Sequence, residues 1–307
     1  MSPRYALRKL AQALLVVWGV STVVFVAVRL SGDPVSLMVS DTAGADEVAR
    51  LRRAYGFDRP IPVQYLAFLA RVARGDFGES LGFNLPAFSV AIGRLPATLA
   101  LALAALAVAV AIGVPAGLLA AVRRNTLLDR AAMLMALLGQ STPTFWSGLL
   151  AILVFAAWWR LLPASGGETW RHLILPACTL GWFSAAKVSR VLRSAVLDVL
   201  TVDFVRTARA KGLTAPSVFV RHVLPNALLS VVALLALELQ LLLGGAIITE
   251  TVFAYPGMGR LVIQAVGTRD YPLVQAIVFV FSFLLVGVNL LVDLLYPWLD
   301  PRIGRDR

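Results

Sequence analysis

Charged residues are scarce in this 307-residue sequence, where they make up only 15% of the positions against a hydrophobic share of 59%. Soluble domains carry about 25% charged residues, so a soluble globular fold is not expected. Cysteine is scarcer still: Cys178 is the only one, which excludes a disulfide framework or a thiolate metal cluster within the chain. The two histidines, His172 and His222, fall in separate segments, so a histidine-based metal or catalytic site is not expected either.

Long apolar runs dominate instead, and the mean hydropathy is +0.81. About 20 apolar residues cross a hydrocarbon core of roughly 30 Å. Six runs reach or approach this length, namely Leu10–Val28, Leu95–Val122, Ala131–Trp159, Leu173–Ala186, Ala227–Ile248 and Leu273–Leu295. The sequence therefore predicts an all-α, polytopic membrane protein with six transmembrane helices. The fourth run is the shortest, and it spans only if its helix continues past Lys187, where Arg190 and Arg193 follow on the same face.

The distribution of basic residues favours one orientation. Placing both termini in the cytoplasm puts most lysines and arginines on the inner side, as the positive-inside rule requires. The first apolar run is too long for a secretory signal and lacks a small-residue cleavage pattern, so an uncleaved anchor is expected. The net charge of +11 is then a signal of topology and lipid contact. A nucleic-acid partner is not expected, because no basic surface interleaved with aromatics is present.

The apolar pattern divides the chain into three parts. Residues 1–30 form a cytoplasmic tip and anchor helix, residues 31–94 an exterior segment with short helices on the membrane face, and residues 95–307 a five-helix core. The alanine-rich stretch at 97–121 predicts close helix packing. Polar residues interrupt the third span at Ser141, Thr142 and Pro143. They indicate a proline kink whose freed backbone groups the hydroxyls satisfy, or a wall of a hydrated pathway, and the two are compatible.

A basic, water-compatible stretch at residues 202–225 interrupts the apolar pattern. Its first part has a helix-forming composition, and Gly212 follows as a residue free to take positive φ at a helix end. Thr214 then offers an N-cap hydroxyl, and Pro216 falls in the first turn of a second short helix. We expect this second helix to close at Pro225, before the next span begins.

The same stretch carries apolar side chains that we expect to be exposed: Phe204, Val205 and Phe219. A solvated loop only needs to connect two spans, whereas two caps and exposed apolar groups specify a rigid element. A plain loop remains the alternative. The helix-glycine-helix pattern favours a structure that a cytoplasmic partner protein grips.

Two ionisable residues, Glu238 and Asp293, fall within apolar spans, where burial costs several kcal/mol unless the group is paired or hydrated. Asp293 is interpreted as structural, with Asn289 and Tyr296 as neighbours. Glu238 is expected either to line a pathway or to bond a neighbouring helix. Neither has an evident basic partner in the sequence, so a proton relay is not favoured.

The spacing Ala208-x3-Gly212-x11-Leu224-Pro225 resembles the EAA loop of binding-protein-dependent ABC importer permeases. Arg206 stands where that family has glutamate, but Arg206-Thr-Ala-Arg-Ala-Lys-Gly-Leu213 is similar to the version found in the dipeptide, oligopeptide and nickel permease subfamily. Further motifs match over nearly the whole length, among them Gly32-Asp33-Pro34, Gly75-Asp-Phe-Gly78, Glu250-x2-Phe253-x2-Pro256-Gly257, Arg269-Asp-Tyr-Pro272 and Asp300-Pro-Arg302. The likeness is to the first of the two permease subunits.

The resemblance implies a type I importer permease of MetI-like fold in the plasma or inner membrane. It implies a heterodimer with a second permease, two cytoplasmic ATP-binding subunits that hold the ATP and Mg, and an extracytoplasmic solute-binding protein. This chain would hold no cofactor or metal and would hydrolyse nothing.

The implied site residues fall into three groups. ATPase-coupling residues would be Val205, Arg206, Thr207, Ala208, Lys211, Gly212 and Leu213. Pathway or intramembrane polar residues would be Ser141, Thr142, Pro143, Glu238 and Asp293, and the exterior binding-protein contacts would be Asp33, Asp76, Phe253 and Tyr255.

The function expected from this resemblance is ATP-driven import of dipeptides, oligopeptides or a similar small solute. Import of nickel chelates or glutathione by the same mechanism is the alternative. An ion-coupled secondary transporter is less favoured, because it predicts paired intramembrane charges and inverted repeats, which the sequence does not display. A membrane-embedded enzyme would need a nucleophile with a base, or a metal cluster, and no such set is apparent.

Overall fold

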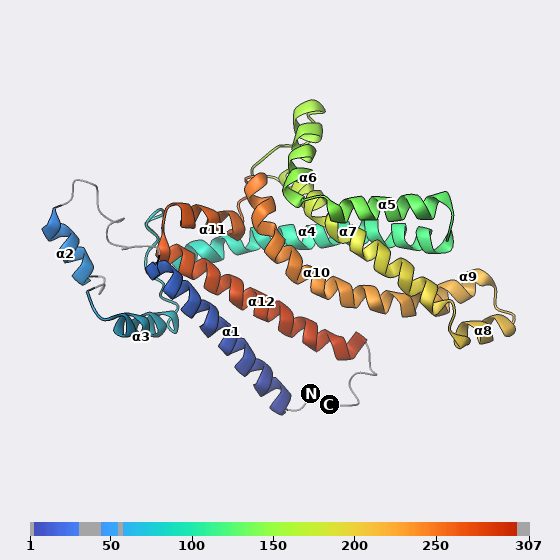
Figure 1. Cartoon of the computed structure of the whole chain (residues 1–307), viewed down its shortest axis with the longest axis horizontal. Coiled ribbons are helices and arrows are strands. Elements are labelled where there is room, and N and C mark those ends of the chain that lie inside the picture. Colours follow the sequence, from blue (N-terminus) through green and yellow to red (C-terminus); the bar gives the residue numbers. More distant parts are fainter. Residues whose placement is uncertain (1–2, 31–43, 55–57, 300–307) are drawn as a thin grey trace. The chain divides into compact units, whose positions relative to one another are not determined.

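The computed structural model describes residues 3–30, 44–54 and 58–299, and most of these are helical (Figure 1). They form two compact units, which are described separately: residues 1–96 with 257–287, and residues 97–256 with 288–307. The all-α prediction is confirmed. The predicted division at residues 30 and 94 concerns placement in a membrane, and it stays a prediction.

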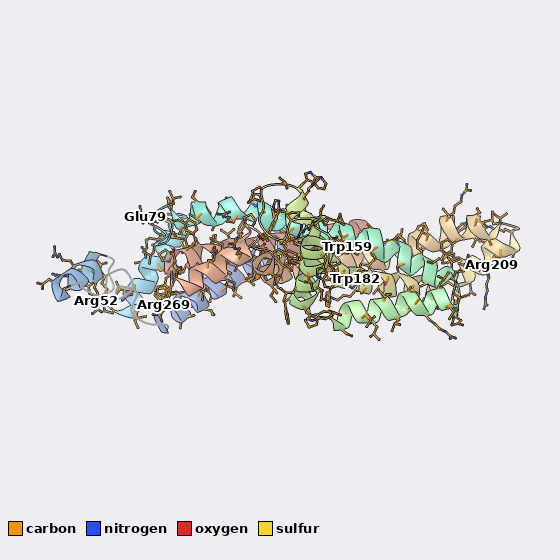
Figure 2. The ribbon with its side chains drawn as sticks, turned by 90° about the horizontal axis from the view of Figure 1, so that it is seen from above. Arg52, Glu79, Trp159, Trp182, Arg209 and Arg269 are labelled. Atoms are coloured by element: carbon orange, nitrogen blue, oxygen red, sulfur yellow. The ribbon has the colours of Figure 1, made fainter. Side chains whose placement is uncertain are left out.

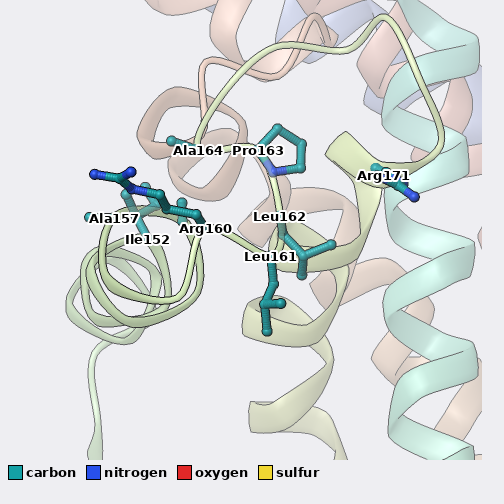
Figure 3. Close-up of a pocket in the computed structure, with 9 residues that line it drawn as sticks. Ile152, Ala157, Arg160, Leu161, Leu162, Pro163, Ala164 and Arg171 are labelled. Carbon is teal, nitrogen blue, oxygen red and sulfur yellow. The ribbon is translucent and has the colours of Figure 1, made fainter.

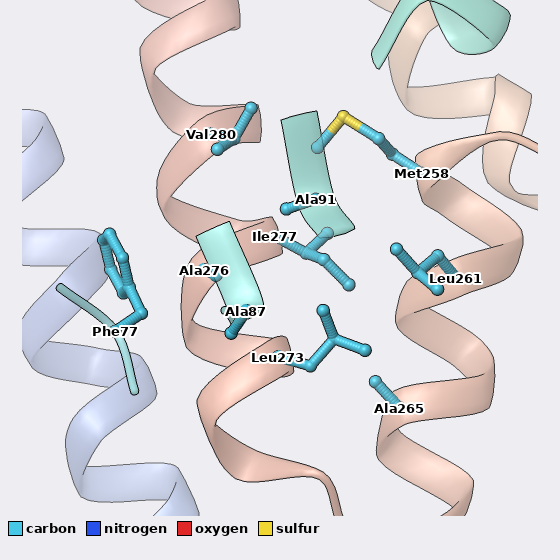
Figure 4. Packing of buried hydrophobic residues seen from close by; sticks show 10 residues of the cluster. All are labelled: Phe77, Ala87, Ala91, Met258, Leu261, Ala265, Leu273, Ala276, Ile277 and Val280. Carbon is cyan, nitrogen blue, oxygen red and sulfur yellow. The ribbon is translucent and has the colours of Figure 1, made fainter. Parts of the chain in front are cut away.

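The first unit contains six helices or parts of helices. They are α1 (Pro3–Leu30), α2 (Ala45–Ala54), α3 (Ile61–Val72), the beginning of α4 (Ala87–Val122), α11 (Met258–Gly267) and most of α12 (Tyr271–Leu299). Its core is an apolar cluster that α4, α11 and α12 build around Ile277 and Leu273, with Phe77 added from the segment before α4 (Figure 4). Small residues at Ala87 and Ala91 let α4 lie close to the other two helices.

The second unit is built on long helices that pack side by side. It holds the rest of α4, α5 (Leu127–Ser141), α6 (Thr144–Ala151) with the π-helical segment η2 (Ile152–Trp158), α7 (Arg171–Val199), α8 (Asp203–Ala210), α9 (Ala215–Val218), the π-helical segment η3 (Phe219–Val223) and α10 (Leu224–Val252). Helix α7 packs along α10 and α5. As predicted, the helix of the fourth run continues past Lys187.

Backbone contact between α4 and α7 confirms the close packing expected from the alanine-rich stretch. A Cβ added to Gly117 would lie 2.6 Å from the carbonyl oxygen of Ser189, and one added to Gly113 would lie 2.7 Å from that of Ala185. From the other helix, a Cβ on Gly181 would lie 2.5 Å from the carbonyl oxygen of Ala105. Such approaches leave no room for a side chain, so glycine is required here for space.

The number of spans is only partly settled by length and composition. Within the described residues, three helices are long and apolar enough to cross a membrane, Ala87–Val122, Ala215–Val252 and Tyr271–Val292, and α5 with α6–η2 adds a fourth if that bent pair is one span. Helices α1 and α7 occur where spans were expected, but the count of six stays a prediction. The helix that contains the second predicted span begins eight residues before that span, at Ala87 instead of Leu95.

The third predicted span is not the kinked helix that was expected. Between its two halves, α5 and α6–η2, the helix direction bends by 105°. Thr142 adopts an extended conformation with ψ of 125° because a proline follows it, and Pro143 has no N–H to continue the helix. The Thr142 hydroxyl donates to the Leu138 carbonyl over 2.6 Å, so it satisfies a backbone group at the break, as was predicted for the hydroxyls here. Ser141 is exposed.

Candidate functional site

The stretch between α7 and α10 forms a compact element that we call the knob, residues 203–223. Helix α8 ends in a Schellman arrangement, in which the Gly212 N–H donates to the Arg209 carbonyl and the Leu213 N–H to the Ala208 carbonyl. Gly212 has a φ of +80°, and a Cβ added to it would meet no atom within 4 Å, so its conformation alone demands glycine. The predicted helix-glycine-helix order is confirmed (Figure 1).

Two details of the knob differ from the prediction. Thr214 is the N-cap residue of α9, but its hydroxyl makes no capping hydrogen bond. Pro225 does not close the second helix, because the chain runs from α9 through the π-helical η3 directly into α10. The wider π turn accommodates the missing N–H and the bulk of the proline ring, and the Asn226 side chain donates to the His222 carbonyl over 2.7 Å.

The knob has a buried inner face, and this corrects one expectation. Val205 was predicted to be exposed, but its side chain is fully buried, and Ala208 is buried beside it. Both belong to a cluster shared with α7, η3 and α10, whose buried members also include Leu192, Val196, Val218, Val223, Ala227 and Val231. The apolar spacing of α8 therefore fixes the knob to the bundle through these two side chains, and their predicted contact with an ATPase stays a prediction.

The outer face of the knob is basic with apolar points. Arg206, Thr207, Lys211, Gly212 and Leu213 are exposed, as a contact surface requires. Phe204 and Val220 are exposed apolar side chains on the same element, at 40% and 58%, and Phe219 is half-buried. Arg206 lies 3.6 Å from Asp203 in an exposed pair, and Arg209 projects from the end of the element (Figure 2).

A buried ion pair joins α7 to α10. The Nζ atom of Lys187 lies 2.8 Å from Oε1 of Glu238, and the Ser184 hydroxyl donates to Oε2 over 2.5 Å. Glu238 is buried, and Lys187 also lies over the Phe183 ring at 4.6 Å. The prediction that Glu238 lacks a basic partner is therefore wrong, and its interpretation as a link to a neighbouring helix is the one that these contacts support.

A second ion pair fixes the start of α5 to α7. Arg193 donates to both carboxylate oxygens of Asp129, from Nε over 2.6 Å and from Nη2 over 2.8 Å. The Asn125 N–H donates to the same carboxylate, and Thr126 caps α5. Sequence reasoning missed this pair, although Arg193 shares a helix with Lys187 and Asp129 stands in the first turn of α5, where an acid is favoured.

A buried carboxylate outside the predicted spans lies near the end of α10. Glu250 is fully buried, and the Thr98 hydroxyl of α4 donates to its Oε1 over 2.7 Å. The sequence indicated Glu250 only as part of a motif, because the predicted span stops at Ile248. Asp293 lies in α12, but its side chain is outside the described residues, so its predicted structural role stays a prediction.

Two of the four residues expected to contact an exterior binding protein have buried side chains, and the role of all four stays a prediction. Phe253 and Tyr255 are only 2% and 7% exposed. Gly148 approaches the Phe253 ring, which explains why this aromatic is inside. Asp76 is exposed, and its carboxylate accepts from the Gly78 N–H, whereas Asp33 lies outside the described residues.

A pocket of about 460 Å³ lies where η2 leads into the following segment (Figure 3). Its lining is mostly apolar, with two arginines, Arg160 and Arg171, on opposite sides. The two guanidinium groups do not converge on a common point, so the pocket has no evident ligand chemistry. It shares no lining residue with the knob. Among the described residues, no group of three or more potential metal ligands is found.

Comparison with known proteins gives consistent matches over the whole chain. The family model for the binding-protein-dependent transport system inner membrane component matches residues 113–305, and the corresponding N-terminal model matches residues 2–102. The chain is 39% identical over 300 residues to the glutathione transport system permease protein GsiC of Salmonella typhimurium, covering 97% of this chain and 98% of that protein. It is 38% identical over 333 residues to the dipeptide transport system permease protein DppB of Escherichia coli K12, covering 98% of each.

Solved structures show the same fold at lower identity. The inward-facing MetNI methionine ABC transporter matches with a TM-score of 0.58 and 21% identity, over 68% of this chain and 96% of that chain. An amino acid ABC transporter matches with a TM-score of 0.54 and 19% identity, over 68% of this chain and 93% of that chain. The MetI-like fold expected from the sequence is confirmed by these likenesses.

Proposed function

Because this chain belongs to the family of binding-protein-dependent transport system inner membrane components, we propose that it is the subunit that passes the motion of an ATPase to a peptide pathway. The chain is a non-catalytic membrane subunit, and ATP hydrolysis is the work of separate subunits. We propose that the pathway forms with a second, similar permease. Two ATP-binding subunits would hold the ATP and Mg, and an extracytoplasmic binding protein would deliver the solute.

The observation that carries the proposal is the construction of the knob. Its inner face is locked into the bundle by Val205 and Ala208, while its outer face presents basic and apolar groups. A partner that pushes on the outer face must therefore move α7 and α10 with it. We propose that Arg206, Lys211 and Leu213 touch the ATP-binding subunit, which requires the knob, and both termini, to lie in the cytoplasm.

Peptides are the cargo that we propose. Support comes from the full-length likeness to a dipeptide permease, and the likeness to a glutathione permease is equally extensive. Glutathione is itself a modified tripeptide, so a pathway for short peptides accommodates both. Nickel chelates are the remaining alternative that the sequence left open, and no described residue favours them.

One observation favours the alternative of an ion-coupled secondary transporter: Lys187 and Glu238 form the paired intramembrane charge that it predicts. Both carboxylate oxygens of Glu238 are already engaged, by Lys187 and Ser184, so the pair is suited to hold helices together. Family membership and the knob support an ATP-driven mechanism instead.

The test combines assembly with transport. The tagged chain is purified in mild detergent, and an ATP-binding subunit and a second permease are expected to co-purify with it. Replacing Gly212 with valine should then reduce ATP-driven peptide uptake and substrate-stimulated ATP hydrolysis while membrane insertion is retained, because a β-branched residue resists positive φ. Normal transport by this variant would show that the knob is not the coupling element.

A further inference from the structure

A closed turn at residues 78–87 leads into α4, and its backbone is extensively hydrogen-bonded. The Ala87 N–H donates to the Gly78 carbonyl over 2.9 Å, and the Ser80 N–H donates to the Leu85 carbonyl over the same distance. Within the turn, the Asn84 N–H donates to the Ser80 carbonyl, and Asn84 takes a φ of +50°. These hydrogen bonds hold the turn in one conformation, which a simple connection between two helices would not need.

A buried carboxylate anchors this turn to the junction of α11 and α12. Asp270 is 1% exposed, and its Oδ2 accepts from the Ser80 hydroxyl over 2.5 Å and from the Gly82 N–H over 3.0 Å. Its Oδ1 accepts from the Leu273 N–H over 3.2 Å, in the first turn of α12. Phe77 and Ala87, at the two ends of the turn, enter the apolar cluster of the first unit (Figure 4). The turn is thus held from both sides.

The tip of the turn, residues 82–86, nevertheless exposes large apolar side chains. Phe83 is 43% exposed and Leu85 is 54% exposed, although the neighbouring Ser80 is buried. Two polar residues on the same unit, Glu79 and Arg269, are also exposed (Figure 2). Apolar anchors on a rigid support with polar residues around them are the composition of a protein-binding surface.

The length of α4 argues against lipid as the occupant of this surface. Between Arg94 and Arg123 the chain carries no charge, and these residues, 95 to 122, are sufficient to cross the hydrocarbon core. Residues 87–94 add about 12 Å of helix beyond that point at 1.5 Å per residue. The headgroup layer is only about 5–8 Å thick on each side. With residues 95–122 as the span, the tip is expected on the aqueous side of the headgroups.

We propose that Phe83 and Leu85 are the anchor through which the soluble, extracytoplasmic solute-binding protein docks on this chain. The inference rests on the proposed function, and it replaces Phe253 and Tyr255, which are buried, with side chains that a partner can reach. Because the turn is already ordered, docking loses little conformational entropy, and the binding protein would offer an apolar depression to receive the tip.

The test uses the complete transporter in lipid nanodiscs, titrated with the purified binding protein that stimulates ATP hydrolysis by the wild-type complex. The double variant Phe83→Ser, Leu85→Ser should raise the binding-protein concentration for half-maximal stimulation by about tenfold or more, because it removes both apolar anchors from the centre of the proposed interface. The matched control is Leu66→Ser on α3, which removes an apolar side chain of the same unit that is at least as exposed and should leave the titration unchanged.

A second measurement detects the contact directly. A photoreactive amino acid at position 83 should cross-link to the purified binding protein, and one at position 66 should not. An unchanged half-maximal concentration in the double variant, or cross-linking of position 83 to lipid alone, would overturn the docking proposal. A wild-type complex that no binding protein stimulates would instead contradict the proposed function itself, so the two failures are distinguishable.

Discussion

Lys187 on α7 and Glu238 on α10 form an ion pair of 2.8 Å, fifty-one positions apart in the sequence, and the carboxylate is almost completely buried. Helix α7 leads directly into the knob, and α10 follows it. The pair therefore ties together the two helices from which the knob projects, and Ser184 completes the carboxylate's hydrogen bonding.

Removing one partner of this pair should cost more than removing both. Lys187→Met leaves a buried carboxylate without its cation, and we expect it to destabilise the protein by about 3 kcal/mol. The double variant Lys187→Met, Glu238→Leu should recover most of that loss, because no uncompensated charge remains. Unfolding of the purified chain in mixed micelles would measure both. Equal losses in the single and double variants would contradict a charge-pair role.

The Arg193–Asp129 pair should depend on the shape of the guanidinium group. Because Arg193 uses two nitrogen atoms on two oxygens, Arg193→Lys retains the charge but loses the forked geometry, and we expect a loss of about 1–2 kcal/mol in stability. Arg190→Lys, on the same helix at an exposed position, is the matched control. Thermal unfolding of the two variants would show whether Arg193→Lys is the less stable one. Equal stability of the two would mean that position 193 needs only a positive charge.

Glycine-to-alanine changes in the long helices should differ in sign from place to place. Alanine normally stabilises a helix by about 1 kcal/mol relative to glycine. At Gly117 the added Cβ would lie 2.6 Å from the Ser189 carbonyl oxygen, so Gly117→Ala should instead separate α4 from α7 and lower the yield of folded protein. Gly93→Ala, also in α4 but with open space around it, should be neutral or stabilising. Size-exclusion profiles and melting temperatures of the two variants test the contrast.

At Gly212, conformation should matter more than size. Gly212→Asn should retain more transport than Gly212→Ala, because asparagine tolerates positive φ better although it is larger. The strain in the alanine variant is expected to be about 1–2 kcal/mol. Uptake of a labelled dipeptide into proteoliposomes, normalised to the amount of assembled complex, gives the ranking. If alanine outperforms asparagine, the positive φ is not what the knob requires.

The knob shows which parts of the structure sequence reasoning could reach. Gly212 and the helices on either side follow from local rules of helix termination, and these predictions are confirmed. The burial of Val205 could not be predicted in the same way, because it depends on α7 and α10 lying beside α8. The basic residues around Val205 suggested that the whole segment is exposed. A short helix can, however, bury an apolar face and expose a basic face at the same time.

Buried polar contacts were the hardest features to predict. Glu238 stands out in the sequence as an exceptional residue in an apolar span, but its partner Lys187 resembles an emerging surface charge. The two side chains meet because α7 stays helical past Lys187 and packs along α10. The packing of these two helices could not be predicted from the local sequence. The sharp turn at Pro143 was underestimated for a related reason: a proline in an apolar run indicates a disturbed helix, but not the 105° between its two halves.

The π turn at residues 219–223 makes the second half of the knob and α10 one uninterrupted helix from Ala215 to Val252. Thirty-eight residues correspond to a rod about 57 Å long. If this rod tilts by only about 5° about the knob, its opposite end moves by roughly 5 Å. If the two ends lie on opposite sides of the membrane, as we propose, a rotation at the knob is carried across it without any hinge.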